Sequence, residues 1–200
     1  KYYNIENIIV VDGGSSDDTL NITKKFNVKI IDIGYRSGYG DAFIKGLDKT
    51  ETKYVCKLNA DGSFDPKYLK KMLNILEDDK SDVVFNSRYL KSSKSLDDTL
   101  IRKVGNFFFT MLCKFLFSTK NTDILYNYHM SKTEFYKNLN LQFKDFSICT
   151  EIPIKFKYLN YRILEIVTVE RARTNGVSKV NAFTDGLKIL FNTLKLVIKK

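Results

Sequence analysis

Short apolar runs alternate with amphipathic stretches along the first half of the chain. The run Ile8-Ile9-Val10-Val11 is apolar and β-branched throughout, which is typical of a parallel strand buried on both faces. Ser15 with Asp18 three residues later resembles a capping box, so we expect a helix from there to about Phe26. The same patterns predict strands over residues 28–33, 53–58 and 82–86, and helices over residues 41–49 and from Pro66 onward. This β-α-β-α-β-α-β order predicts an α/β fold with a parallel sheet and right-handed crossovers.

The second half of the chain is less regular and contains two long amphipathic segments. Residues 101–117 form a strongly apolar helix candidate whose only charges are Arg102, Lys103 and Lys114. Such a helix can pack in a core or rest on a membrane interface. Residues 162–171 are expected to form a strand and residues 183–200 a basic amphipathic helix. No repeat or linker divides the chain, so we expect one domain over residues 1–200, without the roughly 18 uninterrupted apolar residues of a spanning helix.

Composition and charge narrow the setting and the partners. With 44% hydrophobic and 14% aromatic residues, the 200-residue chain is globular rather than disordered. Its three cysteines, Cys56, Cys113 and Cys149, lack metal-type spacing and cannot all pair, which favours a reducing, cytoplasmic setting. The net charge is +10, and residues 171–200 contain seven Lys or Arg against one acid, Asp185. A basic end favours nucleic acid, a diphosphate or an anionic membrane as partner, although a lysine-rich surface alone gives the same pattern.

Polar residues at the ends of two predicted strands form the candidate site, because ligands of open parallel sheets bind beyond the carboxyl ends of the strands. Asp12-Gly13-Gly14-Ser15 ends the first strand. Its glycines allow close backbone approach and its carboxylate can bind a ribose, but the same residues can simply form a turn and a helix cap. Asn59-Ala60-Asp61-Gly62 ends the third strand. Asp61 can hold Mg²⁺ or Mn²⁺ together with phosphate oxygens and water, or merely end the strand.

Four arginines, Arg36, Arg88, Arg102 and Arg173, lie in predicted loops or at element ends. Guanidinium groups at such places can bind phosphates, and each one alone is explained equally well as a surface residue. Their spacing in step with the strand-end acids favours phosphate binding. A nucleic-acid-binding protein is disfavoured, because the sequence has no recognition helix, no RNP-type aromatic strand and no zinc site.

In their order along the chain these motifs resemble family 2 glycosyltransferases, especially the dolichyl- or polyprenyl-phosphate sugar transferases. The resemblance implies a GT-A, Rossmann-like fold: a mostly parallel sheet flanked by helices, with amphipathic helices in the C-terminal half. It also implies a nucleotide-sugar half over about residues 1–90 and an acceptor half over about residues 91–200. The matching segments are IIVVDGGSSDDT (8–19), GYRSGYGDAFIKGL (34–47), KLNADGSFDP (57–66), NSRY (86–89), residues 102–106, EIP (151–153) and RTNGVSK (173–179).

The function implied by the resemblance is a metal-dependent, inverting transfer of a sugar from a GDP-mannose- or UDP-glucose-type donor. The expected acceptor is a polyprenyl or dolichyl phosphate, met by an enzyme peripheral on the cytosolic face of a membrane. A transferase acting on a saccharide hydroxyl and a non-catalytic glycosyltransferase-like module are the alternatives. A lipid phosphate already carries an anionic oxygen, whereas a hydroxyl needs a base, for which Asp123, Glu151 and His129 are candidates. His129 is the only histidine, and a purely structural role explains it as well.

The resemblance also assigns roles to individual residues. Asp61 is expected to bind the divalent metal, Mg²⁺ or Mn²⁺, with Asn59 as a second ligand. Residues expected at the nucleotide sugar are Asp12, Gly14, Arg36, Gly38, Asn59 and Asp61. Residues expected in catalysis are Asp61, Arg88, Arg102, Arg173 and Lys179, of which the last two belong to a late segment that closes over the active site in this family.

The chain departs from the family pattern at four places. Asn59 stands where the family usually has the first acid of D-x-D, and Ser63 where the polyprenyl-phosphate enzymes often have glutamine. Residues 126–128, Tyr-Asn-Tyr, replace a small-residue-plus-glycine segment, which leaves the acceptor open. The family's opening strand should precede Lys1, so we expect it to be missing from this sequence.

Overall fold

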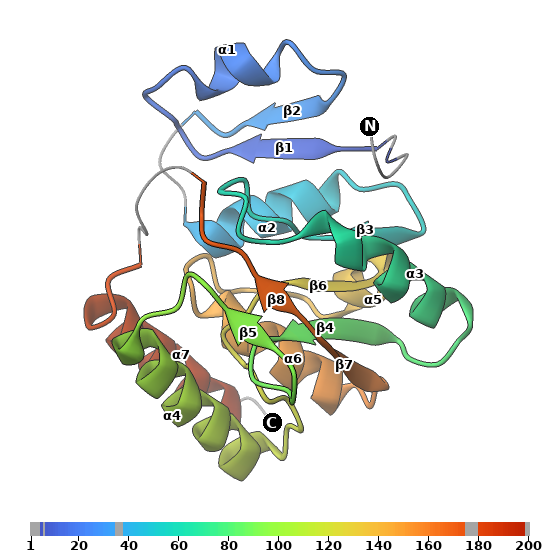
Figure 1. The fold of residues 1–200 in the computed structure, drawn as a ribbon. Coiled ribbons are helices and arrows are strands. Elements are labelled where there is room, and N and C mark those ends of the chain that lie inside the picture. Colours follow the sequence, from blue (N-terminus) through green and yellow to red (C-terminus); the bar gives the residue numbers. More distant parts are fainter. Residues whose placement is uncertain (1–4, 6, 35–37, 175–179, 199–200) are drawn as a thin grey trace.

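The sheet at the centre of the molecule is mixed (Figure 1). The computed structural model describes residues 5, 7–34, 38–174 and 180–198. The strand order is β3-β6-β4-β7, in which β4 and β7 are parallel and β6 runs antiparallel between β3 and β4. Its strands are β3 (Tyr54–Cys56), β4 (Val83–Ser87), β6 (His129–Lys132) and β7 (Ile163–Val167). The sequence pattern predicts β3, β4 and β7 but not β6, whose His-Met-Ser-Lys sequence contains no apolar run.

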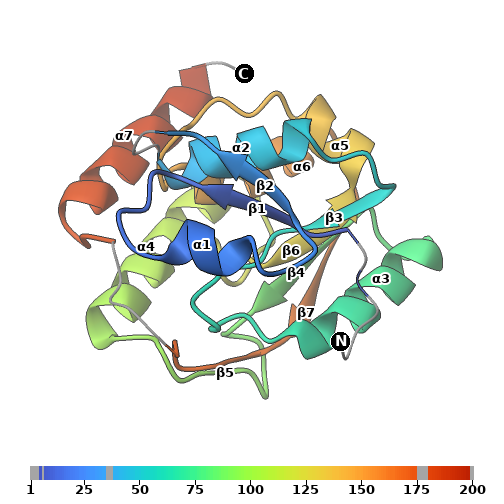
Figure 2. The same ribbon diagram turned by 90° about the horizontal axis from the view of Figure 1, so that it is seen from above.

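A second, two-stranded parallel sheet lies beside the first (Figures 1 and 2). It pairs β1 (Ile9–Asp12) with β2 (Lys29–Asp32), as the apolar runs predict. Helix α2 (Tyr39–Asp48) packs against β1, and a Cβ added at Gly46 would lie 3.0 Å from Val11. Within the described residues no strand pairs with both β1 and β3, so the two sheets remain separate.

The loop after β1 differs from the prediction of a capping box. Ser15 does not cap a helix, because its hydroxyl and its backbone N–H both donate to the side chain of Asp12. Helix α1 spans only Thr19–Thr23, and its N-cap residue Asp18 makes no side-chain capping bond. Helix α1 therefore begins later than predicted, and it also ends earlier, at Thr23 rather than at about Phe26.

Helices cover both faces of the central sheet, which confirms the predicted α/β architecture. Alternate residues of β4 separate the two cores. Val83 and Phe85 pack against α2, α5 (Thr133–Asn138) and α6 (Ile148–Tyr158). Val84 instead packs against the 3-10 helix η1 (Pro66–Tyr68) and α3 (Leu69–Glu77), where the Asp65 side chain accepts from the backbone of Lys67.

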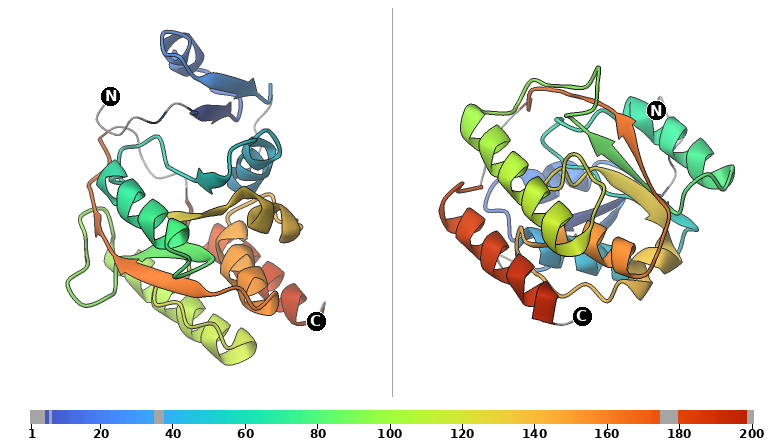
Figure 3. Two further views of the ribbon diagram at one scale, coloured as in Figure 1. Left: turned by 90° about the vertical axis from the view of Figure 1, so that its right-hand side faces the viewer. Right: turned by 90° about the horizontal axis from the view of Figure 1, so that it is seen from below.

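The third core joins the two long helices of the C-terminal half, α4 (Leu100–Phe117) and α7 (Thr184–Ile198), to α6. Figure 3 shows α4 and α7 side by side on the outside of the molecule. A short parallel pair, β5 (Lys94–Ser95) with β8 (Val169–Glu170), lies before α4 and after β7. Of the helices in the described residues, none combines the length and the apolar character needed to cross a bilayer.

Candidate functional site

The loop that follows β3 presents Asp61 toward the segment that follows β8. One carboxylate oxygen, Oδ1, accepts from the backbone N–H and the hydroxyl of Ser63, at 3.0 and 2.7 Å. The other oxygen, Oδ2, lies 3.7 Å from Nη1 of Arg173. Thr174 donates its backbone N–H to the Asp61 carbonyl at 2.8 Å. Gly62 has φ +79°, and an added Cβ would lie 2.9 Å from the Thr174 hydroxyl, so the crossing of the two segments requires glycine here.

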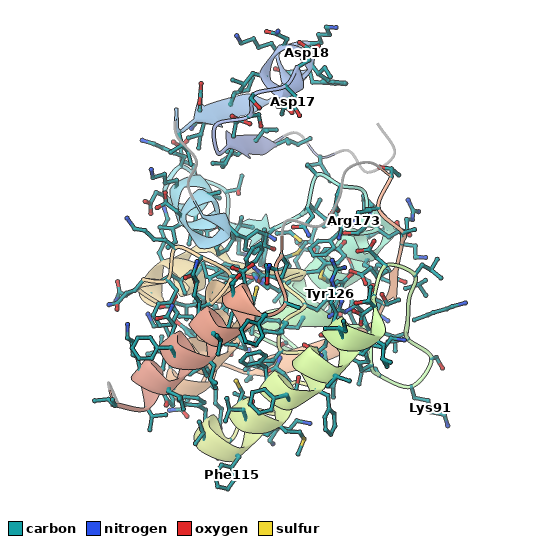
Figure 4. The ribbon with its side chains drawn as sticks, turned by 90° about the vertical axis from the view of Figure 1, so that its left-hand side faces the viewer. Asp17, Asp18, Lys91, Phe115, Tyr126 and Arg173 are labelled. Atoms are coloured by element: carbon teal, nitrogen blue, oxygen red, sulfur yellow. The ribbon has the colours of Figure 1, made fainter. Side chains whose placement is uncertain are left out.

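Asp97 joins two of the predicted arginines. Arg173 donates to its carboxylate through Nη2 at 2.6 Å and Nε at 3.0 Å, and Nη1 of Arg102 lies 3.5 Å from the same group. The hydrogen bonds from Arg173 lower the pKa of Asp97. Asp61, Arg102 and Arg173 thus come together from three distant parts of the chain. We call Asp61, Asp97, Arg102 and Arg173 the acid–arginine cluster; Figure 4 labels Arg173 within it.

Arg88 is held by carboxylates inside the protein. Its Nε and Nη2 donate to the two oxygens of Asp123 at 2.8 and 2.9 Å, and Nη1 lies 3.4 Å from Glu170. The guanidinium also lies 4.5 Å from the ring centre of Tyr126, and its side chain is only 11% exposed. Burial opposes the charge, but Asp123 and Glu170 raise the pKa of Arg88 well above its ordinary value. A contact between Arg88 and a ligand phosphate therefore stays a prediction.

The first predicted loop is organised around Asp12, which is 4% exposed. Its Oδ2 accepts from the backbone N–H groups of Gly14 and Ser15 at 3.0 and 2.9 Å. Burial opposes ionisation, but the bonds from Ser15 and Gly14 outweigh it and lower the pKa of Asp12. Close packing explains the glycine at position 38 without a ligand, since an added Cβ would lie 2.1 Å from the carbonyl oxygen of Lys144.

The structure does not describe every residue predicted for the site, and the site contains residues that the sequence did not predict. Arg36 and Lys179, and with Lys179 most of the late closing segment, lie outside the described residues. Asp97 was not predicted, because an acid just before a helix is usually explained by the helix terminus alone. Lys57 was not predicted either, because one lysine at a strand end carries no recognisable motif.

Lys57 follows β3 and turns inward. Its Nζ lies 2.7 Å from Oδ1 of Asn59 and 3.8 Å from the ring centre of Tyr39, with Phe64 at 5.4 Å. Burial lowers the pKa of Lys57 to about 7. The hydroxyl of Tyr39 also donates to Oδ1 of Asn59, at 3.3 Å. The amide oxygen at position 59 is therefore engaged from two sides.

A hydrogen-bonded chain leads from Tyr39 into the core. The amide nitrogen of Asn127 donates to the Tyr39 hydroxyl at 3.4 Å. His129 is fully buried, with Nε2 bonded to Oδ1 of Asn127 and Nδ1 bonded to the hydroxyl of Tyr136. Burial, and to a smaller extent the charge of Lys57, lowers the pKa of His129 to about 3. At neutral pH this histidine is uncharged and has no free ring nitrogen.

The residues in the loop after β3 fit a divalent cation that is coordinated mainly by phosphate oxygens and water and by only one protein carboxylate. Across the described residues no three His, Cys, Asp or Glu side chains gather as a metal site would need. One carboxylate with phosphate oxygens and water is sufficient for Mg²⁺ or Mn²⁺. Asp61 has a carboxylate oxygen facing the cluster, whereas the oxygen of Asn59 is bonded to Lys57. This geometry favours Asp61 over Asn59 as the metal ligand.

The chain is similar to known glycosyltransferases in sequence and in fold. The chain is 26% identical to the UDP-N-acetylglucosamine–dolichyl-phosphate N-acetylglucosaminyltransferase of Methanococcus voltae, over 99% of this chain and 88% of that protein. It is 25% identical to glycosyltransferase AglJ of Haloferax volcanii, over 85% of this chain but only 55% of that one. The glucosyl-3-phosphoglycerate synthase of Mycobacterium tuberculosis, solved with Mn²⁺, UDP and glucosyl-3-phosphoglycerate, superposes with a TM-score of 0.72 at 15% identity, covering 96% of this chain and 69% of that one.

The superposition shows a shared GT-A fold, which confirms the predicted fold class. The model of the glycosyl transferase family 2 domain matches residues 1–150, three quarters of the chain. That match includes the loops that present Asp12 and Asp61. The chain therefore belongs to glycosyl transferase family 2.

Proposed function

We propose that this chain transfers a sugar from a nucleoside-diphosphate sugar to a polyprenyl phosphate at a membrane surface. One observation carries the proposal: α4 begins at the acid–arginine cluster and continues away from it with an exposed apolar side. A phosphate bound at the cluster would thus be continuous with an apolar surface. A lipid phosphate has this combination of an anionic head and an apolar chain, and a soluble saccharide does not.

The donor is proposed to bind at Asp12, at the end of β1, and at Asp61, in the loop after β3. Asp61 would hold a divalent cation, which supplies positive charge for the diphosphate leaving group. Arg173 lies 3.7 Å from Asp61 and adds a second positive charge at the same place. The Methanococcus voltae relative is named for a UDP-sugar donor, which favours UDP over GDP as the nucleotide to test first.

The acceptor is proposed to be a phosphate because the candidate bases for a hydroxyl are all occupied. Asp123 is fully buried and accepts three hydrogen bonds from Arg88. Glu151 accepts two backbone N–H groups and pairs with Lys155 at 2.7 Å. His129 has both ring nitrogens bonded inside the core. A phosphate oxygen is already anionic, so positioning and electrostatic stabilisation suffice for its attack.

The membrane contact is proposed for the outer side of α4 and α7, which we call the apolar face. Its side chains are large, hydrophobic and between 37% and 86% exposed. Lysines 103, 114, 188 and 195 flank them, as suits an anionic bilayer surface. Figure 4 shows Phe115 projecting outward from the far end of α4. The residues of the apolar face are Leu100, Ile101, Val104, Phe107, Phe108, Met111 and Phe115 on α4, Phe183 just before α7, and Leu187, Phe191, Leu194, Val197 and Ile198 on α7.

A groove of about 480 Å³ on α4 gives the lipid chain a specific place. Its lining includes the apolar side chains of Phe107 and Met111 together with Lys103 and Lys114. Its lining residue Lys103 is adjacent along α4 to Arg102 of the acid–arginine cluster. An isoprenoid chain in this groove would direct its phosphate toward Arg102.

The part of the proposal that concerns the donor is tested by calorimetric titration of UDP and GDP, each with and without Mn²⁺. Wild type is compared with Asp61→Ala and with Asp48→Ala, an exposed acid in α2 that serves as the matched control. We expect Mn²⁺-dependent binding of one nucleotide that is lost in Asp61→Ala and kept in Asp48→Ala. Absence of binding to wild type under all conditions would favour the non-catalytic module.

The acceptor half is tested by transfer to a polyprenyl phosphate in anionic vesicles, with a soluble saccharide as the competing acceptor. Vesicle binding is measured for Phe115→Ser and for Phe26→Ser, which changes an equally apolar side chain, 64% exposed, outside the apolar face. We expect Phe115→Ser to weaken vesicle binding several-fold and Phe26→Ser to leave it unchanged. Equal vesicle binding by the two variants, or transfer to the saccharide alone, would contradict the membrane-acceptor proposal.

A further inference from the structure

Asn59 is held in one orientation by the side chains around it. An ammonium group can only donate, so with Lys57 charged the atom 2.7 Å from its Nζ is the amide oxygen of Asn59. Tyr39 donates to the same oxygen at 3.3 Å. The amide NH₂ group therefore points the other way. Across the described residues, nothing accepts a hydrogen bond from it.

The chain of hydrogen bonds behind Tyr39 has one consistent direction. Neutral His129 carries one N–H, which faces the oxygen of Asn127, so its Nδ1 accepts from Tyr136. The amide nitrogen of Asn127 then donates to the oxygen of Tyr39 at 3.4 Å. The hydroxyl proton of Tyr39 is left for Asn59. The buried network and Lys57 thus impose the same orientation on position 59.

Aromatic side chains around Lys57 also favour the position of its Nζ beside Asn59. Its Nζ lies 3.8 Å from the ring centre of Tyr39, a distance at which the aromatic face attracts a cation. Phe64, which is 5% exposed, borders the same space. An aliphatic residue would fit this pocket and pack well, so packing alone does not explain a lysine at position 57.

On the basis of the proposed function, we propose that Lys57 is a positioning residue that turns Asn59 into a hydrogen-bond donor for an oxygen of the nucleoside-diphosphate sugar. The amide NH₂ group of Asn59 then donates a hydrogen bond to an acceptor atom of the ligand, either a ribose hydroxyl oxygen or a phosphate oxygen. Asp61, two residues later, remains the carboxylate at the cation. Asparagine at position 59, where the family usually has aspartate, and lysine at position 57 thus act together to present one hydrogen-bond donor to the nucleotide sugar.

The test is a double-mutant cycle on nucleotide affinity, read by calorimetry rather than by turnover. Wild type, Lys57→Met, Asn59→Ala and the double variant are titrated with UDP and with GDP, with and without Mn²⁺. We expect each single variant to weaken binding by about tenfold, the value of one hydrogen bond. The double variant should be no weaker than Asn59→Ala by more than about twofold, because Lys57 acts only through Asn59.

Three results would overturn the inference. Additive losses would mean that Lys57 contacts the ligand itself, and an unchanged affinity of Lys57→Met would mean that Asn59 needs no positioning. A loss in Asn59→Ala confined to the Mn²⁺ titrations would make Asn59 a metal ligand. If Lys57→Met does not fold, Tyr39→Phe takes its place in the cycle, since it removes the other donor to the Asn59 oxygen.

Failure of the proposed function is distinguishable from failure of this inference. If wild type binds neither nucleotide with or without Mn²⁺, the donor site itself is absent, and this result refutes both the proposed function and the inference about Lys57. If wild type binds and Asp61→Ala abolishes the effect of Mn²⁺, the donor site stands. The cycle of Lys57 with Asn59 then decides the inference alone.

Discussion

The buried histidine of β6 makes the stability of the fold sensitive to mild acid. His129 has no exposed surface, and burial lowers its pKa from 6.5 to about 3. In the unfolded chain the imidazole binds a proton near pH 6.5, but in the folded protein it stays neutral down to about pH 3. Protons therefore bind the unfolded state preferentially between these values, so acid favours unfolding.

The size of this effect follows from the two pKa values. Stability is complete above about pH 6.5 and falls as the pH decreases toward 3, with a limiting slope of about 1.4 kcal/mol per pH unit. Between pH 7 and pH 5 the loss from His129 alone amounts to about 2 kcal/mol. For a domain of ordinary stability this is a substantial fraction of the free energy of unfolding.

The assay is urea unfolding of wild type and His129→Gln at pH 7, 6 and 5. Glutamine keeps a donor and an acceptor for Asn127 and Tyr136 but does not titrate. The variant will have a lower stability at pH 7, and only the change with pH is compared. Wild type should lose about 2 kcal/mol more than the variant between pH 7 and pH 5. Parallel pH profiles would refute the reasoning, because they would mean that the folded histidine titrates like the unfolded one.

Four further substitutions test the site and the packing around it. Asp97→Asn should slow sugar transfer by at least about tenfold without lowering the melting temperature, because Arg173 loses its anchor; unchanged turnover would contradict this role. Arg88→Met leaves a buried carboxylate unpaired and should cost about 3–5 kcal/mol in urea unfolding. Gly40→Ala would place a Cβ 2.2 Å from the Phe143 carbonyl oxygen and should cost about 1–3 kcal/mol, whereas Gly105→Ala, in open space on α4, should gain about 0.5–1 kcal/mol. Equal melting temperatures for the two alanine variants would refute the steric argument.

The parts of the fold that the sequence predicts are those fixed by local patterns. Apolar runs predict strands, and β1, β3, β4 and β7 fall where such runs occur, but of these four only β4 is buried along its whole length and the predicted burial of β1 on both faces is wrong. The strand-end rule locates the loop that carries Asp61, although β3 ends at Cys56 and Asp61 lies further along that loop. Its proximity to Arg102 and Arg173 follows from the family resemblance and not from any local signal.

The parts that the sequence does not predict depend on contacts between distant segments. β6 is polar and four residues long, and it becomes a strand only because β3 and β4 offer edges on both sides. Ser15 is expected to cap a helix, but its hydroxyl and its backbone N–H donate to the buried carboxylate of Asp12 instead, and no local pattern distinguishes the two arrangements. Asp97 is one of two adjacent acids before α4, and nothing local distinguishes the one that meets Arg173.

Helix α4 shows why an apolar pattern can support two interpretations at once. Its residues are apolar around most of the circumference, so the sequence alone allows either a core helix or an interfacial helix. Phe109, Cys113 and Phe117 recur at helical spacing and pack against α6 and α7, while Phe107 and Phe115 on the other side are 68% and 86% exposed. The helix is therefore a core helix on one side only. Within the residues that the structure describes, this other side stays exposed. Because the helix starts at the acid–arginine cluster, the proposed contact of this side with a membrane would bring lipid phosphates to that end of the molecule.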